Sequence, residues 1–147
     1  MVPAAMAPAS SGDQPLRDTI VLRVGQMGFA GTTGIEYRLE PNGDWRAANF
    51  VNEKTMEAVG EGKLAPDKLV ALSRKLNNTD LAAVKAEAKT FEGVNPALVE
   101  LRYLDETTTV KFPPGYTPDQ PCPYEPSEPL CRFLELTDLI RSSLPTK

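Results

Sequence analysis

The side chains of this chain that could carry acid–base, nucleophilic or metal chemistry do not occur at the spacing of a catalytic site. The 147 residues include no histidine, which removes the commonest general base, a common zinc ligand and every nucleophile–histidine pair. Glu36 and Glu40 could in principle act as the two carboxylates of a glycosidase. With Arg38, however, they form the polar face of one predicted strand. We therefore expect no enzymatic activity, no cofactor and no metal site.

The two cysteines, Cys122 and Cys131, flank a proline-rich segment. Two thiolates without histidine do not make a structural zinc site, and their separation is not that of a CxxC redox pair. The intervening prolines keep this segment out of a helix. This favours a loop closed by a Cys122–Cys131 disulfide, as in exported proteins, over the alternative of two free buried thiols in a reducing compartment.

Gly25, Gly28 and Gly31 follow a predicted strand, in a pattern that invites comparison with phosphate-binding loops. A dinucleotide fingerprint requires a helix to begin at the glycines. Here the residues that follow, Gly34 to Glu40, alternate like a strand. We interpret the segment from Gly25 to Gly31 as a glycine-rich loop that connects two strands of a hairpin.

Alternating apolar and polar residues predict a sheet built from hairpins. The expected strands lie at 19–24, 34–40, 45–51, 97–104 and 107–112, with a further strand at 54–64 that Gly60 and Gly62 interrupt. Asn42-Gly43 predicts a type I′ turn, because both central residues of that turn need a positive φ. The last hairpin is expected to turn at Asp105-Glu106.

Three segments have helical periodicity, at 66–76, 81–88 and 130–144. Pro66 suits the first turn of the first helix, Thr79-Asp80 is expected to cap the second, and Ser127 the third. Because hairpins rather than strand–helix–strand crossovers connect the strands, we predict an α+β fold. It consists of an antiparallel β-sheet of hairpins with two or three helices packed on one face.

The chain divides into a leader, residues 1–17, and a single α+β domain, residues 18–147. The leader is rich in proline and small residues and lacks periodicity. Two of its tripeptides, Ala5-Met6-Ala7 and Ala7-Pro8-Ala9, have the form that ends a signal peptide, so it is either the remnant of a signal peptide or a flexible leader. Together with the cysteine loop, this predicts an extracytoplasmic protein, periplasmic or secreted.

Charge and hydropathy narrow the class of partner. The net charge is −4 and the 16 basic residues are scattered along the sequence, whereas a nucleic-acid binder usually has a basic stripe with interleaved aromatic residues. No stretch approaches the ~20 apolar residues of a membrane-spanning helix. We therefore expect neither nucleic-acid binding nor direct membrane insertion, and the expected partner is another protein.

The segment from Ile20 to Thr33 resembles the first hairpin of the emfourin-like proteins, which inhibit protealysin- and thermolysin-type metalloproteases. It shares a strand, a Gly-Phe-Ala-Gly loop and a second strand, and a leucine-rich helix, a hairpin and a closing helix follow in the family's order. The resemblance implies a protein that covers a protease cleft with a rigid loop. It places the partner contacts in one segment: Gln26, Met27, Gly28, Phe29, Ala30, Gly31, Thr32 and Thr33.

Two alternatives stay open. Phe29 either tucks under the sheet as a plug or stands out as an anchor for the partner. Because Phe is more often buried, we expect the plug, with the partner contacts on Gln26, Met27, Thr32 and Thr33. The chain could also be a structural or accessory subunit of an extracytoplasmic protein assembly, with no inhibitory activity.

Overall fold

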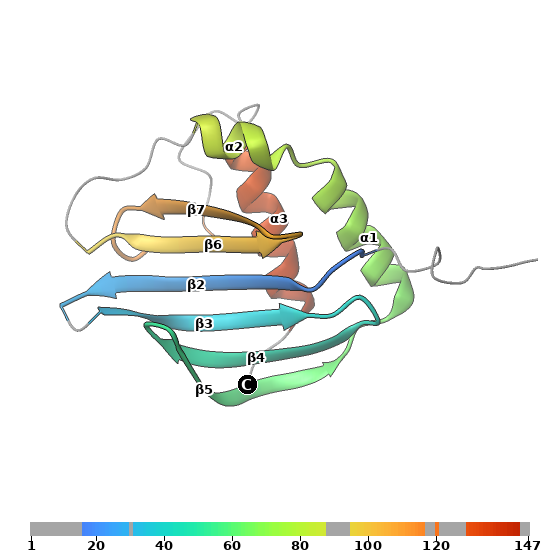
Figure 1. Ribbon diagram of the computed structural model, residues 1–147, viewed down its shortest axis with the longest axis horizontal. Helices are drawn as coiled ribbons and strands as arrows, with labels where there is room; N and C mark the ends of the chain where they lie inside the picture. The colour runs from blue at the N-terminus through green and yellow to red at the C-terminus, as the bar shows by residue number, and fades with distance from the viewer. Residues whose placement is uncertain (1–15, 30, 88–94, 117–119, 121–128, 145–147) are drawn as a thin grey trace, which may run out of the picture.

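The protein is built on one six-stranded antiparallel sheet. A computed structural model describes residues 16–29, 31–87, 95–116, 120 and 129–144 (Figure 1). The strands are β2 (Ile20–Gly28), β3 (Gly31–Leu39), β4 (Asp44–Val51), β5 (Lys54–Lys63), β6 (Ala97–Tyr103) and β7 (Glu106–Phe112). Their order across the sheet is β5-β4-β3-β2-β6-β7, so β2 is central and joins two sets of hairpins.

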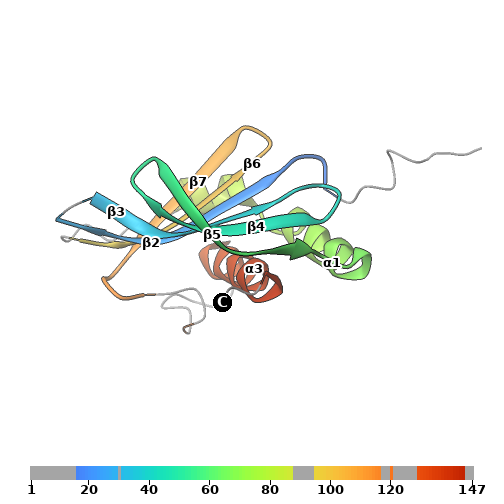
Figure 2. The same cartoon turned by 90° about the horizontal axis from the view of Figure 1, so that it is seen from below.

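Three helices complete the described fold: α1 (Pro66–Asn77), α2 (Leu81–Glu87) and α3 (Pro129–Ser143). The helices α3 and α1 lie on the same side of the sheet, and α2 contacts α3 and β7 (Figures 1 and 2). None of the described helices covers the opposite side, which we call the open face (Figure 2). The predicted α+β fold with an antiparallel sheet is confirmed.

Strict alternation along the central strands supplies the core. Leu22 pairs with Tyr37 and Val24 with Ile35, so their side chains share the face that the helices cover. The predicted stripe of the last helix is buried against this face, with Phe133 fully enclosed. Burial of this apolar surface is the main stabilising term of the fold.

The turn between β3 and β4 differs from the type I′ turn predicted from Asn42-Gly43. Of these two residues, Gly43 alone has a positive φ, of 99°. The Gly43 N–H donates a 2.9 Å hydrogen bond to the Glu40 carbonyl, which makes Pro41 the first central residue of the turn. The proline ring holds φ at about −65°, a value incompatible with a turn that needs two positive φ angles. The prediction is wrong because it ignored Pro41.

Both positive φ angles of a type I′ turn occur in the last hairpin instead. Leu104 and Asp105 have φ values of 52° and 62°, and Tyr103 pairs with Glu106 to close the turn. The turn therefore lies one residue before the predicted Asp105-Glu106. Leucine is a poor residue for this conformation, so sequence preference alone does not locate the turn. The position of the turn follows instead from the register of β6 and β7, which is set by the alternate residues that each strand buries.

Packing extends two residues into the predicted leader. Leu16 is fully buried in the core, and the Arg17 N–H donates a 3.1 Å hydrogen bond to the Tyr103 hydroxyl. The ordered domain thus includes residue 16, and residues 1–15 lie outside the described part of the chain. Among the described residues, no helix has the length and hydropathy needed to span a membrane.

Candidate functional site: the β2–β3 hairpin

The segment predicted to bind a partner is a hairpin with a very short tip. β2 continues through Gly28 and β3 begins at Gly31, and these two residues pair. The glycines therefore do belong to a hairpin connection, but Gly25 to Gly28 form strand rather than the predicted loop. The tip consists of Phe29 and of residue 30, which lies outside the described residues.

Phe29 is fully exposed, at 109% of its reference area, so the expectation that it plugs the sheet is wrong. A plug needs a surface beneath it, and Phe29 comes directly after Gly28, the last paired residue of β2. The flanking Gly28 and Gly31 have no side chains to cover the ring. The structure therefore displays an aromatic ring at the end of the hairpin.

Asn52, in the turn between β4 and β5, clamps the hairpin near its tip. Its backbone N–H donates a 2.7 Å hydrogen bond to the Thr32 carbonyl, and its Oδ1 accepts a 2.9 Å hydrogen bond from the Thr32 N–H. Gly31 has a φ of 117°, and a β-carbon there would collide with the Asn52 side chain. Glycine is therefore required at this position by both backbone conformation and space.

Two facing glycines lie beside a phenylalanine ring that is buried on the open face. Gly25 and Gly34 lie opposite each other on β2 and β3, and Phe50 of β4 pairs with Gly34. Although Phe50 lies on the face without helices, only 1% of its area is exposed. A β-carbon on Gly25 would lie 3.0 Å from the ring, and one on Gly34 would lie 2.5 Å from Gly25 Cα. Gly25 thus makes room for Phe50, and Gly34 allows the backbones of β2 and β3 to approach each other.

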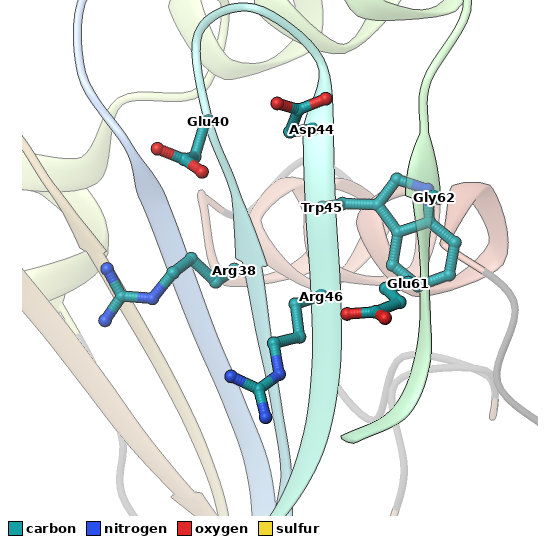
Figure 3. A pocket seen from close by; sticks show the side chains of 7 residues that line it. All are labelled: Arg38, Glu40, Asp44, Trp45, Arg46, Glu61 and Gly62. Carbon is teal, nitrogen blue, oxygen red and sulfur yellow. The ribbon is translucent and has the colours of Figure 1, made fainter. Parts of the chain in front are cut away.

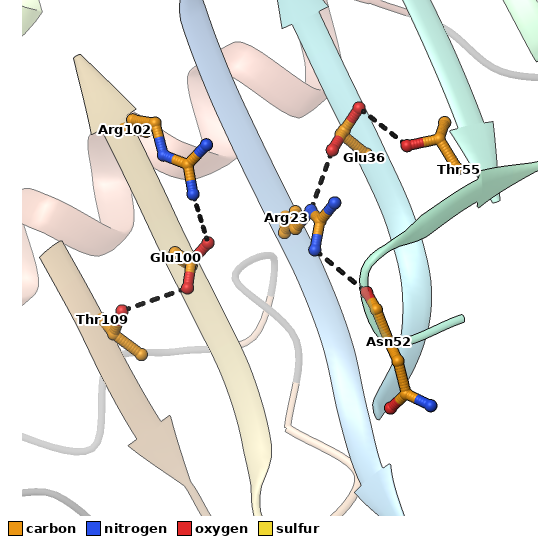
Figure 4. Close-up of polar contacts among 7 residues, drawn as sticks. All are labelled: Arg23, Glu36, Asn52, Thr55, Glu100, Arg102 and Thr109. Atoms are coloured by element: carbon orange, nitrogen blue, oxygen red, sulfur yellow. Dashed lines mark hydrogen bonds and ion pairs between the residues drawn. The ribbon is translucent and has the colours of Figure 1, made fainter. Parts of the chain in front are cut away.

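Arg23 and Glu36 lie over Phe50 and form with it a small cluster on the open face. The Arg23 guanidinium carbon lies 4.6 Å from the centre of the Phe50 ring, a favourable cation–π position. Arg23 Nε donates a 2.8 Å hydrogen bond to Glu36, and Nη1 donates a 3.1 Å bond to the Asn52 carbonyl (Figure 4). Thr55 of β5 adds a 3.5 Å bond to the other Glu36 oxygen. The cluster therefore joins β2, β3, β4 and β5.

The side-chain amide of Gln26 forms hydrogen bonds within the chain, so it is not free to contact a partner. Its Nε2 donates a hydrogen bond to the Asn95 carbonyl, and its Oε1 accepts a 3.0 Å bond from the Gly115 N–H. Its amide thus joins β2 to the segments that flank β6 and β7. Of the predicted contact residues, Gly28, Phe29 and Thr33 are the exposed ones, while Met27 and Thr32 are half-buried.

Sequence reasoning missed the residues that hold the hairpin in place. Asn52, Phe50 and Arg23 lie on different strands or turns, and no local pattern connects them. The one available signal was Asn52 itself, since asparagine tolerates the positive φ of 55° that it adopts in the turn.

The structure tests the predicted disulfide and the expected absence of a metal site only as far as the described residues extend. Cys131 is buried in α3 and is not a free thiol, while Cys122 lies outside the described residues, so their pairing stays a prediction. Within the ranges that the structure describes, no three His, Cys, Asp or Glu side chains gather in a way that could hold a metal ion.

Two glycine substitutions test how the hairpin is packed. Gly34→Ala should lower the free energy of unfolding by about 2 kcal/mol or more, because its β-carbon collides with the β2 backbone. Gly28→Ala is the matched control, since the nearest atom to its β-carbon, the Gly31 carbonyl oxygen, is 3.8 Å away. We expect the control to change stability by less than about 0.5 kcal/mol. Urea denaturation measures both, and equal losses would contradict the packing described for Gly34.

Comparison with known proteins assigns no family to the chain. No protein-family model and no curated protein matches it. The function is therefore argued from the hairpin and the sheet.

Proposed function

We propose that this protein is a non-enzymatic binding module that inhibits a thermolysin-type metalloprotease by inserting the tip of the β2–β3 hairpin into the protease cleft. The observation that carries the proposal is the full exposure of Phe29 at the end of a hairpin whose base is fixed. An exposed aromatic ring gains free energy when a partner buries it, about 1.5–3 kcal/mol for complete burial.

Rigidity at the base of the hairpin makes this gain available for binding. The Asn52 clamp and the Arg23–Glu36 ion pair hold both strands before any partner arrives. A pre-organised loop loses little conformational entropy on docking, so more of the contact energy appears as affinity. Aromatic anchors of this kind are typical interface hot spots.

The choice of a protease as the partner rests on the resemblance of Gly28-Phe29-Ala30-Gly31 and its surrounding elements to the emfourin-like inhibitors. A tip of two residues is narrow enough to enter a cleft. The same proposal places the protein in an extracytoplasmic compartment, where thermolysin-type proteases would meet it and where the Cys122–Cys131 disulfide could form.

Phe29→Ala tests the proposed anchor. In a titration of thermolysin with the intact protein, we expect stoichiometric inhibition that weakens by about 30-fold in the variant, as for a hot spot worth about 2 kcal/mol. The stability of the variant to urea should stay within about 0.5 kcal/mol, because the ring is fully exposed.

Val70→Ala is the control for this substitution, since Val70 is also exposed but lies on α1. It should leave inhibition unchanged. A protein that is digested by thermolysin or leaves its activity unchanged would contradict the inhibitor proposal and favour an accessory subunit. Equal inhibition by Phe29→Ala would contradict the role of the ring.

The disulfide is tested by alkylation and mass spectrometry on protein from an oxidising compartment. Because Cys131 is only 2% exposed, alkylation has to be done in guanidinium chloride, where a buried free thiol would also react. We expect no alkylated cysteine before reduction and two after it. A Cys131→Ser variant should show one alkylated cysteine without reduction. Two alkylated cysteines in the unreduced protein would exclude the disulfide and weaken the argument for export.

A further inference from the structure

The open face of the sheet gathers arginines that are scattered in the sequence. Val21 of β2 pairs with Arg102 of β6 on one side and with Arg38 of β3 on the other. Arg38 in turn pairs with Arg46 of β4. These pairings place three arginines in one row across four neighbouring strands, on a protein whose net charge is −4.

Arg38 and Arg46 differ from the other arginines of this face because they lack an acidic partner. Arg23 is bound to Glu36 at 2.8 Å, and Arg102 lies 3.9 Å from Glu100 (Figure 4). In the part of the chain that the structure describes, no ion pair or side-chain hydrogen bond involves Arg38 or Arg46, and both are exposed. Arg38 and Arg46 lie directly opposite each other, and like charges in such a pair are destabilising, although Glu61 of β5 lies opposite Arg46 on its other side and offsets part of the repulsion. An anion between the two guanidinium groups would remove that repulsion.

The surface on both sides of this arginine pair is hollowed. One hollow of about 460 Å³ extends toward the β3–β4 turn, and Glu40, Asp44 and Glu61 line it together with the two arginines (Figure 3). A second hollow of about 210 Å³ lies on the other side, lined also by Ala48, Thr55 and Glu36, whose charge is paired with Arg23. Both hollows are lined by Arg38 and Arg46, so a chain crossing the sheet could occupy both and contact the arginines between them.

We propose that Arg38 and Arg46 form a binding site for the carboxylate of an acidic side chain carried by a partner protein. Two guanidinium groups on adjacent strands can donate several hydrogen bonds to one carboxylate. The three acidic residues around the larger hollow repel a phosphate dianion more strongly than a singly charged carboxylate.

Nucleic acid fits this face less well. Single-stranded nucleic acid is bound by tracks of several cations and by aromatic rings on which bases stack. On the open face, Phe50 is buried beneath Arg23, and among the described residues Arg38 and Arg46 are the two arginines of this face outside an ion pair. The proposal concerns a different surface from the hairpin tip and does not depend on protease inhibition.

The site can be tested by NMR on the full chain, with an acetylated and amidated hexaglutamate peptide as the probe. We expect saturable shifts of the Arg38 and Arg46 Nε–Hε signals. In the Arg38→Gln/Arg46→Gln variant, the affinity for the peptide should fall by about tenfold or more, the range of two charge-assisted contacts. The variant should unfold at nearly the same urea concentration, because both side chains are exposed.

The matched control is Lys68→Gln/Arg74→Gln, which removes the same charge from exposed positions of α1. It should weaken peptide binding much less than the double arginine variant. Equal weakening by both variants would mean that the loss of affinity comes from net charge alone, and it would overturn the proposal.

Parallel titrations use inorganic phosphate and an oligouridylate. Tighter binding of either one than of hexaglutamate would overturn the choice of a protein carboxylate.

Discussion

The position of the β2–β3 hairpin depends on the burial of Phe50. This ring lies on the open face of the sheet, which no described helix covers. A large ring can be enclosed there because Gly25 leaves space beneath it and Arg23 lies above it. The ring belongs to β4, while the glycines belong to β2 and β3, so its burial fixes the outer strands against the central ones. A side chain at Gly25 would remove this space, and one at Gly34 would collide with the backbone of β2.

The ion pair between Arg23 and Glu36 extends the same cluster to the β4–β5 turn. Arg23 binds the Asn52 carbonyl, and Asn52 binds the backbone of Thr32 on both its donor and acceptor groups. A chain of contacts thus runs from the middle of the open face to the base of the hairpin tip. An ion pair of this kind adds little net stability by itself, because both groups lose water. Its effect here is to define where the turn and the hairpin lie.

Much of the fold could be predicted from periodicity, and the exceptions have particular physical causes. The helix that begins at Pro66 and the apolar stripe of the last helix were visible because their apolar residues recur at helical spacing. The turn at Asn42 was mispredicted because Pro41 fixes the backbone before it, and the turn at Leu104 because strand register outweighs local preference. Leu16 was assigned to the leader because a single apolar residue beyond a strand carries no periodic signal.

The candidate site was predictable in position but not in detail. The glycines marked a hairpin, yet the exposure of Phe29 depends on how far β2 and β3 remain paired, which composition does not reveal. The arginine pair could not be found from the sequence, since Arg38 and Arg46 become neighbours only through the register of β3 and β4. The pairing of Cys122 with Cys131 stays a prediction.

The central claim is that the hairpin is fixed up to its tip before any partner binds. Amide hydrogen exchange of Thr32 tests this most directly, because its N–H is held by the Asn52 side chain rather than by a strand partner. We expect this amide to exchange slowly, with protection close to that of amides within the β2–β3 ladder, and to lose protection in Asn52→Ala. Exchange of the Thr32 amide at the rate of an unstructured peptide would contradict the claim.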